Sequence, residues 1–262
     1  MTFEEKIKKL SEENLMKTKE KLIESSELNN KCPICNNNFW IMDNNGNAKR
    51  CKCWEREKQR RKISFANIPM KYKEATFDNY RTEIYRSETM QKIKELCREY
   101  TEKFEKKQKG LFLSSHVKGS GKTRMAATIC TALMDKGISV KFATSSSIIE
   151  EIKKTWDKNN AYTESSLIDA LISTDVLVVD DFGTENLREW VNDKFYYIIN
   201  ERYINERTTL YTSNYKISEL AYDERIINRI RETCYYIPFP EESIREQIEK
   251  DNIKEMAIML MR

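Results

Sequence analysis

The stretch that decides the fold is Leu111-Phe112-Leu113, followed after a short polar segment by Gly119-Ser120-Gly121-Lys122-Thr123 and a helical pattern that opens at Arg124. An apolar run before a glycine-containing turn and a helix is the strand–loop–helix context of a phosphate-binding loop. Backbone N–H groups and the positive end of the helix attract phosphates there. We therefore expect these loop residues and Arg124 to bind nucleotide, with Lys122 reaching the β- and γ-phosphates and the Thr123 hydroxyl holding Mg²⁺.

The loop departs from the full pattern G-x-x-x-x-G-K-[ST] at one position, because His116 stands where the pattern has its first glycine. A plain Gly-Ser-Gly turn with an incidental Lys-Thr pair is therefore the alternative. His116 is the single histidine of the chain. One imidazole cannot make a metal site or a catalytic triad, so we expect His116 to shape the loop entrance.

A second motif, Asp175-Val176-Leu177-Val178-Val179-Asp180-Asp181, supplies two carboxylates. Its unbroken apolar run predicts a strand buried on both faces of a parallel sheet. Open α/β sheets bind ligands at the carboxyl ends of their strands. Asp180 is therefore suited to hold Mg²⁺ and Asp181 to polarise the attacking water, although a buried strand with solvated acidic ends is the alternative. Together with Lys122, the pair predicts a nucleoside triphosphatase.

Two further segments extend the predicted site. Residues 208–214 read as a strand with polar residues at its end, where Asn214 could orient the lytic water or touch the γ-phosphate. Residues 224–232 form a helical pattern whose three isoleucines share one face and whose three arginines face solvent or a neighbour. A solvated basic helix is the default for such a pattern, and an arginine offered to a neighbour's phosphate is the alternative.

In order and spacing, these motifs resemble the DnaC/DnaI-type replicative helicase loaders of the AAA+ class. The resemblance covers about residues 30–250 and departs from the pattern at His116 and at Asp181, where many AAA+ proteins have glutamate. It implies an arginine finger at Arg229 and a sensor 2-like contact from Arg245. The matching segments are residues 119–123 (Walker A), 178–183 (Walker B), 212–214 (sensor 1), 224–229 (the arginine-finger box) and 243–245 (a Ser-x-Arg motif).

The resemblance also implies a function. A protein of this kind binds ATP or ADP with Mg²⁺, assembles into a ring or spiral, and loads a hexameric DnaB-type helicase onto single-stranded DNA. Its ATPase is expected to be slow and regulated by DNA or by its partner. Two alternatives stay open: an IstB-type transposition helper, which usually lacks a zinc module, and a non-hydrolysing nucleotide-binding adaptor, which His116 keeps possible.

A cysteine cluster precedes these motifs, with Cys32 and Cys35 separated by fifteen residues from Cys51 and Cys53. Two thiolate pairs joined by a short hairpin can surround Zn²⁺, and Asn44-Asn45-Gly46 is a suitable hairpin turn. Four thiolates leave no open position, so the zinc would be structural. A disulfide pair or unbonded cysteines are the alternatives. In the family that the chain resembles, a similar N-terminal module engages the helicase.

Single-stranded DNA would be held by the segment after the second strand of the sheet. Residues 144–147 offer hydroxyls and amides, and the following helix carries Lys153, Lys154, Trp156 and Lys158. Such a combination suits a single strand, which needs positive charge and a stacking surface more than base readout. An amphipathic surface helix that packs through its isoleucines is the alternative.

The remaining sequence sets the organisation. We expect a charged helix at residues 1–30, a zinc-binding module at 31–54, a basic linker and lead-in at 55–82, and an AAA+ ATPase domain at 83–262. Mean hydropathy is −0.73 and net charge is +4; no apolar run approaches a membrane span, so a soluble, cytoplasmic protein is expected.

The ATPase domain should have an α/β fold, because short apolar runs alternate with helical patterns. A five-stranded parallel sheet would lie between helices, and the last 22 or so residues suffice for about one helix and no separate lid domain. Gly137 should cap the first helix in a left-handed conformation. The expected strands are 111–115, 138–144, 175–181, 208–213 and 234–239; the expected helices are 83–108, 122–135, 146–157, 164–173, 187–205 and 217–232.

Overall fold

The computed structural model describes residues 32, 34–35, 38–42, 48–54, 66–157 and 163–260. The chain divides into two compact units, Met1–Arg61 and Lys62–Arg262. The predicted N-terminal helix, the hairpin turn at Asn44-Asn45-Gly46 and the basic run of the linker lie outside the described residues.

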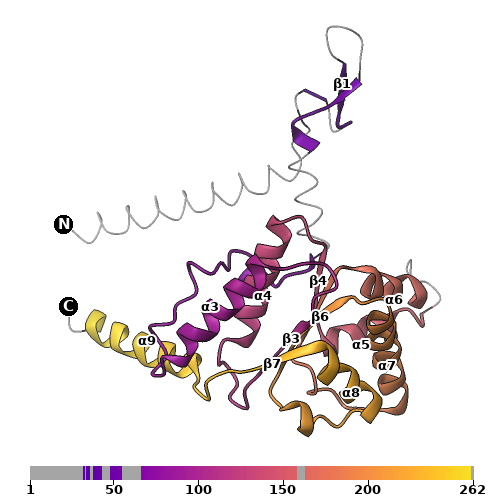
Figure 1. Ribbon diagram of the computed structural model, residues 1–262. Helices are drawn as coiled ribbons and strands as arrows, with labels where there is room; N and C mark the ends of the chain where they lie inside the picture. Colours follow the sequence, from indigo (N-terminus) through magenta and orange to yellow (C-terminus); the bar gives the residue numbers. More distant parts are fainter. Residues whose placement is uncertain are drawn as a thin grey trace. The chain divides into compact units, whose positions relative to one another are not determined.

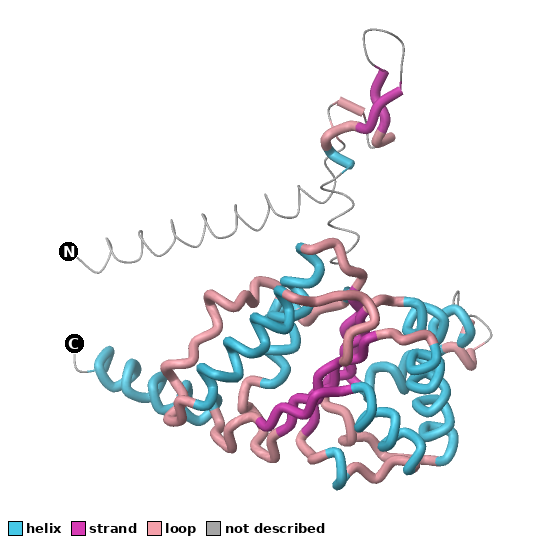
Figure 2. Tube along the Cα trace, in the orientation of Figure 1, coloured by secondary structure: helices cyan, strands magenta, loops and turns pink. Residues whose placement is uncertain are grey.

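The larger unit is built on a five-stranded sheet whose strands are all parallel and follow the order β4-β5-β6-β3-β7. Figure 2 shows these strands running through the middle of the unit. The predicted sheet is confirmed, and each strand lies within two residues of its expected position. The strands are β3 (Gly110–Ser114), β4 (Val140–Thr144), β5 (Val176–Asp180), β6 (Thr208–Ser213) and β7 (Cys234–Pro238).

Helices cover both faces of this sheet (Figure 1). Successive side chains of a strand point to opposite faces, and β5 shows the result. Val176 and Val178 pack on one face of the sheet, in the core that includes α3 and α4. Leu177 and Val179 pack on the other face, in the core that includes α5, α6, α7 and α8. The first group is α3 (Thr89–Glu102) and α4 (Lys122–Asp135); the second is α5 (Ser145–Lys154), α6 (Glu164–Ser173), α7 (Glu189–Ile204) and α8 (Glu224–Thr233).

Two helix predictions were too long. The helix expected at 83–108 is only α3, because Tyr85 turns inward to a buried position and Lys107 has a φ of 74°. The helix expected at 217–232 begins only at Glu224, where the Asp223 side chain accepts a hydrogen bond from the Arg225 N–H and caps it. The residues before it form the 3-10 turn η2 (Ile217–Glu219) and an irregular segment.

The ends of α4 and of the chain follow the predictions. Gly137 has a φ of 84°, and the N–H of Ile138 donates to the Leu133 carbonyl at 3.1 Å, which closes α4 with a left-handed cap. After β7 there is one helix, α9 (Ile244–Leu260), and no separate lid domain within the described residues. None of the described helices has both the length and the apolar character of a membrane span.

The smaller unit contains an antiparallel hairpin of β1 (Trp40–Met42) and β2 (Ala48–Arg50). Ile41 packs against the buried cysteines. On the strands, Trp40 pairs with Arg50, and the Arg50 guanidinium lies 3.8 Å from the Trp40 ring centroid and 4.3 Å from that of Trp54. This arginine therefore sits between two indole rings.

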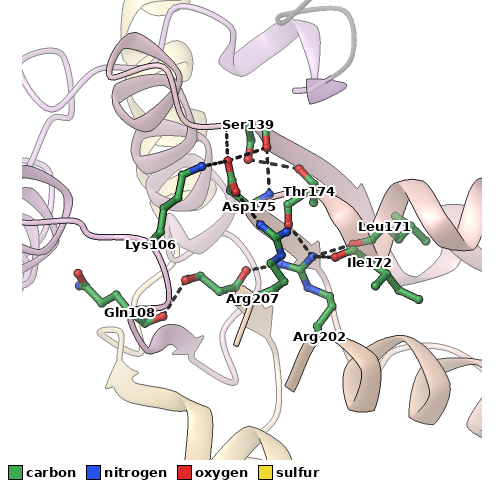
Figure 3. Close-up of polar contacts among 10 residues, drawn as sticks. Lys106, Gln108, Ser139, Leu171, Ile172, Thr174, Asp175, Arg202 and Arg207 are labelled. Atoms are coloured by element: carbon green, nitrogen blue, oxygen red, sulfur yellow. Dashed lines mark hydrogen bonds and ion pairs between the residues drawn. The ribbon is translucent and has the colours of Figure 1, made fainter. Parts of the chain in front are cut away.

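A buried arginine joins the amino ends of β5 and β6 (Figure 3). Arg202 is 1% exposed, and its guanidinium donates to the carbonyls of Leu171, Ile172, Thr174 and Thr208 and to the Thr209 hydroxyl. Beside it, Asp175 pairs with Lys106 and Arg207. The network ties the end of α6 to the sheet at the edge opposite to the carboxyl ends of the strands.

Candidate functional site

The phosphate loop (residues 115–123) leaves β3 and enters α4 through two glycines in the left-handed region. Gly119 has a φ of 88° and Gly121 a φ of 92°, which side chains rarely tolerate. A Cβ atom at Gly121 would also lie 2.3 Å from the Tyr85 hydroxyl and 2.4 Å from the Tyr80 hydroxyl. Glycine is therefore required at position 121 by both conformation and space.

Lys122 places its ammonium group inside the loop. Its Nζ donates to the carbonyls of Ser115 at 3.0 Å and Val117 at 3.3 Å and to the Ser120 hydroxyl at 3.2 Å. The side chain is buried, and this burial lowers the pKa of the ammonium group although Asp181, Glu241 and Asp180 oppose the shift. The Lys122 ammonium group is thus hydrogen-bonded to uncharged carbonyl and hydroxyl oxygens of the loop.

His116 does not disturb the loop. Its φ is not positive, unlike those of Gly119 and Gly121. Its imidazole is 46% exposed and lies 3.6 Å from the Glu219 carboxylate of η2. The first position of the loop pattern therefore needs no glycine in this chain, and the histidine lies at the loop entrance as predicted.

Asp180 lies at the carboxyl end of β5, buried beside the loop. Its Oδ1 accepts a hydrogen bond from the Thr212 hydroxyl at 2.6 Å, and the Thr123 side chain lies near enough to lower the pKa of the Asp180 carboxyl. Burial, aided by Asp181, raises the pKa of the Asp180 carboxyl to about 6, against the effect of the two threonines. Thr123 and Asp180 are thus adjacent oxygen donors, which is the donor type that Mg²⁺ prefers.

Asp181 is exposed and has a φ of 54°, which is unusual for a residue with a side chain. Its backbone is held on both sides. The Asp181 N–H donates to the Thr212 hydroxyl at 3.0 Å, and its carbonyl accepts from the Ser145 hydroxyl at 3.0 Å. Ser145 also lies 2.6 Å from Glu185, whose other oxygen accepts from the Gly183 N–H. Burial raises the pKa of Glu185.

The segment that follows β7, residues 239–245, runs along the phosphate loop and is here named the C-terminal strap. Its contacts follow the loop in order from Ser114 to Gly119. At the start of the loop, the Phe239 N–H donates to the Ser114 carbonyl, and the Ser115 hydroxyl donates to the Pro240 carbonyl. The Glu241 carboxylate then accepts from the N–H groups of His116 and Val117. Finally, the Ile244 N–H donates to the Gly119 carbonyl. The Arg245 stem lies against Gly119, with its Cγ 3.0 Å from an ideal Cβ there.

The lead-in segment (residues 66–88) lies against the loop as well. The Arg86 N–H donates to Glu242 of the strap at 2.8 Å. A cavity of about 220 Å³ opens between the lead-in, the loop and the first turns of α9. Its walls include the apolar groups of Ile84, Tyr85, Val117 and Ile244. The rest of its lining is polar or charged and includes Arg86, Glu242 and Lys250, so the cavity beside the phosphate loop has a mixed surface.

Three predicted residues make no side-chain hydrogen bond to the loop within the described residues. Arg124 turns to the lead-in, where it donates to the Asn79 carbonyl at 2.8 Å. Asn214 is half-buried and its side chain makes no hydrogen bond to the described residues; Thr212 is the β6 residue that contacts Asp180. Arg229 lies on α8 with its guanidinium 3.9 Å from the Tyr203 ring centroid and 3.9 Å from Glu232.

The segment predicted to hold single-stranded DNA has hydroxyls that are already engaged. The Thr144 hydroxyl accepts from the Ser147 N–H and caps α5, and Ser147 donates back to the Thr144 carbonyl. Ser145 is fully buried. Trp156 is 56% exposed and contacts Trp190 edge-to-face, so charge and ring surface are what this region offers. Lys158 lies outside the described residues.

The four cysteines of the smaller unit converge. Their sulfur atoms all lie within 4.8 Å of one another, and Cys32 Sγ and Cys51 Sγ are 3.8 Å apart. Zinc–sulfur bonds of about 2.3 Å in a tetrahedron imply sulfur–sulfur distances of roughly 3.8 Å. N–H groups of Cys35 and Ile34 lower the pKa of the Cys32 thiol to about 6, whereas desolvation and the neighbouring cysteines raise the pKa of the Cys53 thiol. The donor set fits Zn²⁺.

Several residues at the site were not predicted from the sequence. Tyr80 and Tyr85 under the loop, Glu241 on its amides, and Glu185 behind Asp181 carry no motif. Tyr80, Tyr85 and Glu241 are brought there by contacts between distant parts of the chain, whereas Glu185 follows Asp181 closely in the sequence and bonds the Gly183 N–H. A tyrosine or glutamate in an irregular segment gives no local signal of such contacts. The lead-in predicted at residues 55–82 includes Tyr80, whereas Tyr85 falls in the helix predicted at 83–108.

Comparison with known proteins agrees with this geometry. The sequence profile of the family described as "IstB-like ATP binding protein" matches residues 44–251. The chain is 28% identical over 194 residues to the replicative helicase loader DnaC of Buchnera aphidicola subsp. Baizongia pistaciae, which covers 73% of this chain and 77% of the relative. With DnaC of Escherichia coli strain K12, identity is 28% over 190 residues, or 70% and 76% of the two chains.

Among solved structures, the crystal structure of the DnaC helicase loader is similar with a TM-score of 0.57 and 25% identity, covering 66% of this chain and 100% of that one. The predicted AAA+ α/β fold and the resemblance to DnaC-type proteins are thereby confirmed. The chain belongs to the family of IstB-like ATP-binding proteins.

Proposed function

We propose that this protein is an ATP-dependent loader that places a hexameric DnaB-type helicase onto single-stranded DNA during replication. The observation that carries the proposal is the adjacency of the phosphate loop, Thr123 and Asp180 in a chain whose curated relatives are named replicative helicase loaders. ATP would bind with its phosphates on Gly119–Arg124, of which Lys122 would contact the β- and γ-phosphates.

Residues of this chain would divide the work at the triphosphate. Thr123 and Asp180 would hold Mg²⁺, which neutralises developing charge on the phosphates. Asp181 would polarise the attacking water, and its backbone is fixed by Thr212 and Ser145. Asn214 is half-buried beyond the end of β6, where it could orient that water. The base would occupy the cavity beside Val117, against the side chains of Ile84 and Ile244.

Two arginines would sense the γ-phosphate. Arg245 already lies on Gly119 through its stem and needs only a rotation of its exposed end. Arg229 has no contact with its own phosphate loop, so it would act on the nucleotide of a neighbouring protomer in a ring or spiral. Its guanidinium would leave Tyr203 and Glu232 for that purpose.

The remaining parts would serve partners. The cysteine cluster would hold structural Zn²⁺ through Cys32, Cys35, Cys51 and Cys53, and the module would engage the helicase. Lys153, Lys154 and Trp156 would contact single-stranded DNA by charge and stacking. Hydrolysis would be slow and would serve as a switch that releases the loader rather than as a motor.

The test is co-purification with a candidate replicative helicase in the presence of ATP, followed by mass measurement of the complex and by a helicase-loading assay on single-stranded DNA. We expect a complex and loading with the wild-type chain and loss of loading with Lys122→Ala. Capture of a transposase instead of a helicase would support a transposition helper. Phosphate release that is equal for wild type and Lys122→Ala would support a non-hydrolysing adaptor.

A further inference from the structure

Two buried tyrosines lie directly beneath the phosphate loop. Tyr80 is 2% and Tyr85 is 8% exposed, and their hydroxyl oxygens are 3.1 Å apart. The Tyr85 hydroxyl donates to the Ser120 carbonyl at 2.9 Å, and the Tyr80 hydroxyl reaches the Gly121 carbonyl at 3.3 Å. Both carbonyls belong to the part of the loop that would hold phosphate.

The direction of a carbonyl fixes the direction of the next N–H. In a trans peptide the C=O and the following N–H lie in one plane and point in opposite directions, and the described residues contain no cis peptide. The Ser120 carbonyl is turned toward Tyr85, so the Gly121 N–H is turned away from it. By the same argument, the Gly121 carbonyl, which also accepts from the Met125 N–H, turns the Lys122 N–H outward.

We infer that Tyr80 and Tyr85 are positioning residues that orient the N–H groups of Gly121 and Lys122 toward the phosphates of the bound nucleotide. The inference rests on the proposed nucleotide binding. Without the tyrosines, the Ser120–Gly121 peptide unit could rotate, and the Gly121–Lys122 unit would be held by the Met125 N–H alone, so the Gly121 amide above all would have to be ordered at the moment of binding. The entropy lost in ordering these amides would weaken nucleotide binding, although the groups that contact the nucleotide stay the same.

Both hydroxyls are suited to this role because they stay protonated. Burial raises the pKa of Tyr85 to about 12 and that of Tyr80 well above its usual value. The absence of a side chain at Gly121 is what lets the two hydroxyls approach, since a Cβ there would lie within 2.4 Å of each. The two tyrosines of the lead-in can therefore reach the loop only because position 121 is glycine.

The experiment compares ADP and ATP affinity, measured by calorimetry, in wild type, Tyr85→Phe, Tyr80→Phe and the double variant. Loss of one such hydrogen bond should raise the Kd of both nucleotides about fivefold, and the double variant should show more. Tyr100→Phe is the matched control, because the equally buried Tyr100 hydroxyl donates to the Lys109 carbonyl at 2.8 Å, away from the loop.

A readout beyond affinity separates positioning from general loosening. Tyr85→Phe and Tyr100→Phe should lower the melting temperature by similar amounts, while only Tyr85→Phe weakens ADP. Equal ADP affinity in wild type and Tyr85→Phe, or equal weakening in Tyr85→Phe and Tyr100→Phe, overturns the inference alone. A wild-type chain that binds no ADP overturns the proposed function together with it.

Discussion

The hydroxyl of Thr212 joins the side chain of Asp180 to the backbone of Asp181, donating to Asp180 Oδ1 at 2.6 Å and accepting from the Asp181 N–H at 3.0 Å. Thr212 is fully buried on β6, the strand next to β5. One hydrogen and one lone pair of a single side chain thus set the orientation of Asp180 and the backbone of Asp181.

Replacing Thr212 by valine should reduce ATP hydrolysis by about 10–100-fold, the usual effect of losing a partner that orients a metal ligand. It should also destabilise the fold by roughly 1–3 kcal/mol, because the Asp181 N–H loses its acceptor. Phosphate release and urea unfolding measure the two effects. Thr101→Val is the control, since the Thr101 hydroxyl is equally buried but bonds the Cys97 carbonyl of α3. Similar activity losses in both variants would contradict the role of Thr212.

Stability should depend on pH through Glu185. Burial raises the pKa of this carboxyl in the folded state, so its contribution is fully present below the unfolded-state pKa and is lost as pH rises through the folded-state pKa. Glu185→Gln stays neutral and should gain stability relative to wild type as pH increases from about 4.5. Urea unfolding of both proteins between pH 4.5 and 8 measures the difference. A difference that does not change with pH would refute the assignment, and the exposed Glu150→Gln serves as control.

Arg202→Met should be one of the most destabilising single changes in the chain. The substitution leaves several buried carbonyls without a donor, for which a loss on the order of 3–5 kcal/mol is expected. Arg207→Met is the comparison, because its ion pair with Asp175 is partly exposed and is worth about 0–1 kcal/mol. Denaturant unfolding at neutral pH gives both values, and losses of equal size would argue against the network in Figure 3.

Charge on α5 should govern binding to single-stranded DNA. Substitution of Lys153 and Lys154 by alanine should flatten the slope of log K against log[salt] by about 1.4, as two lost phosphate contacts imply. Alanine at the exposed Lys71 and Lys73 removes the same charge elsewhere. The slope is measured by fluorescence anisotropy with a labelled oligothymidine, and an unchanged slope in the α5 variant removes the assignment.

Removal of zinc should act on the smaller unit alone. Chelation, or Cys51→Ser, should abolish about one equivalent of bound zinc, measured by inductively coupled plasma mass spectrometry, and should weaken helicase binding. ADP affinity should not change, because the nucleotide site lies wholly within Lys62–Arg262, which has its own core. A protein that is purified without zinc and still binds helicase would contradict the zinc prediction.

The sequence predicted the fold well because its signals are local. The strands are uninterrupted apolar runs such as residues 176–179, and the phosphate loop needs two positive φ angles that only its glycines supply easily. The two overlong helices failed for a different reason. Helical spacing continues through residues 83–88 and 217–223, but Tyr85, Leu220 and Tyr222 are drawn into the core, and this tertiary packing overrides the periodic pattern.

The site residues could be predicted only where they belong to a motif of consecutive residues. Lys122, Asp180 and Asp181 belong to motifs, whereas Glu241 reaches the loop from a distant part of the chain. For β6 the sequence pointed to Asn214, since motif logic selects the polar residue at the strand end. The role of Asn214 stays a prediction. The register of the sheet additionally brings Thr212 to Asp180, and register is a property of paired strands rather than of one segment.

The C-terminal strap has a practical consequence for observing the protein in solution. Residues 239–245 form a series of hydrogen bonds with the loop, and the lead-in packs against the loop as well. Binding of ATP should therefore slow deuterium uptake in three peptides that are far apart in the chain: the lead-in, the loop and the C-terminal strap. A protease that cuts after Glu241 would free Ile244 and Arg245 from Gly119 while leaving the bonds of Phe239 and Glu241 and every Walker residue intact, so a preparation nicked there should retain nucleotide less well than the uncut chain.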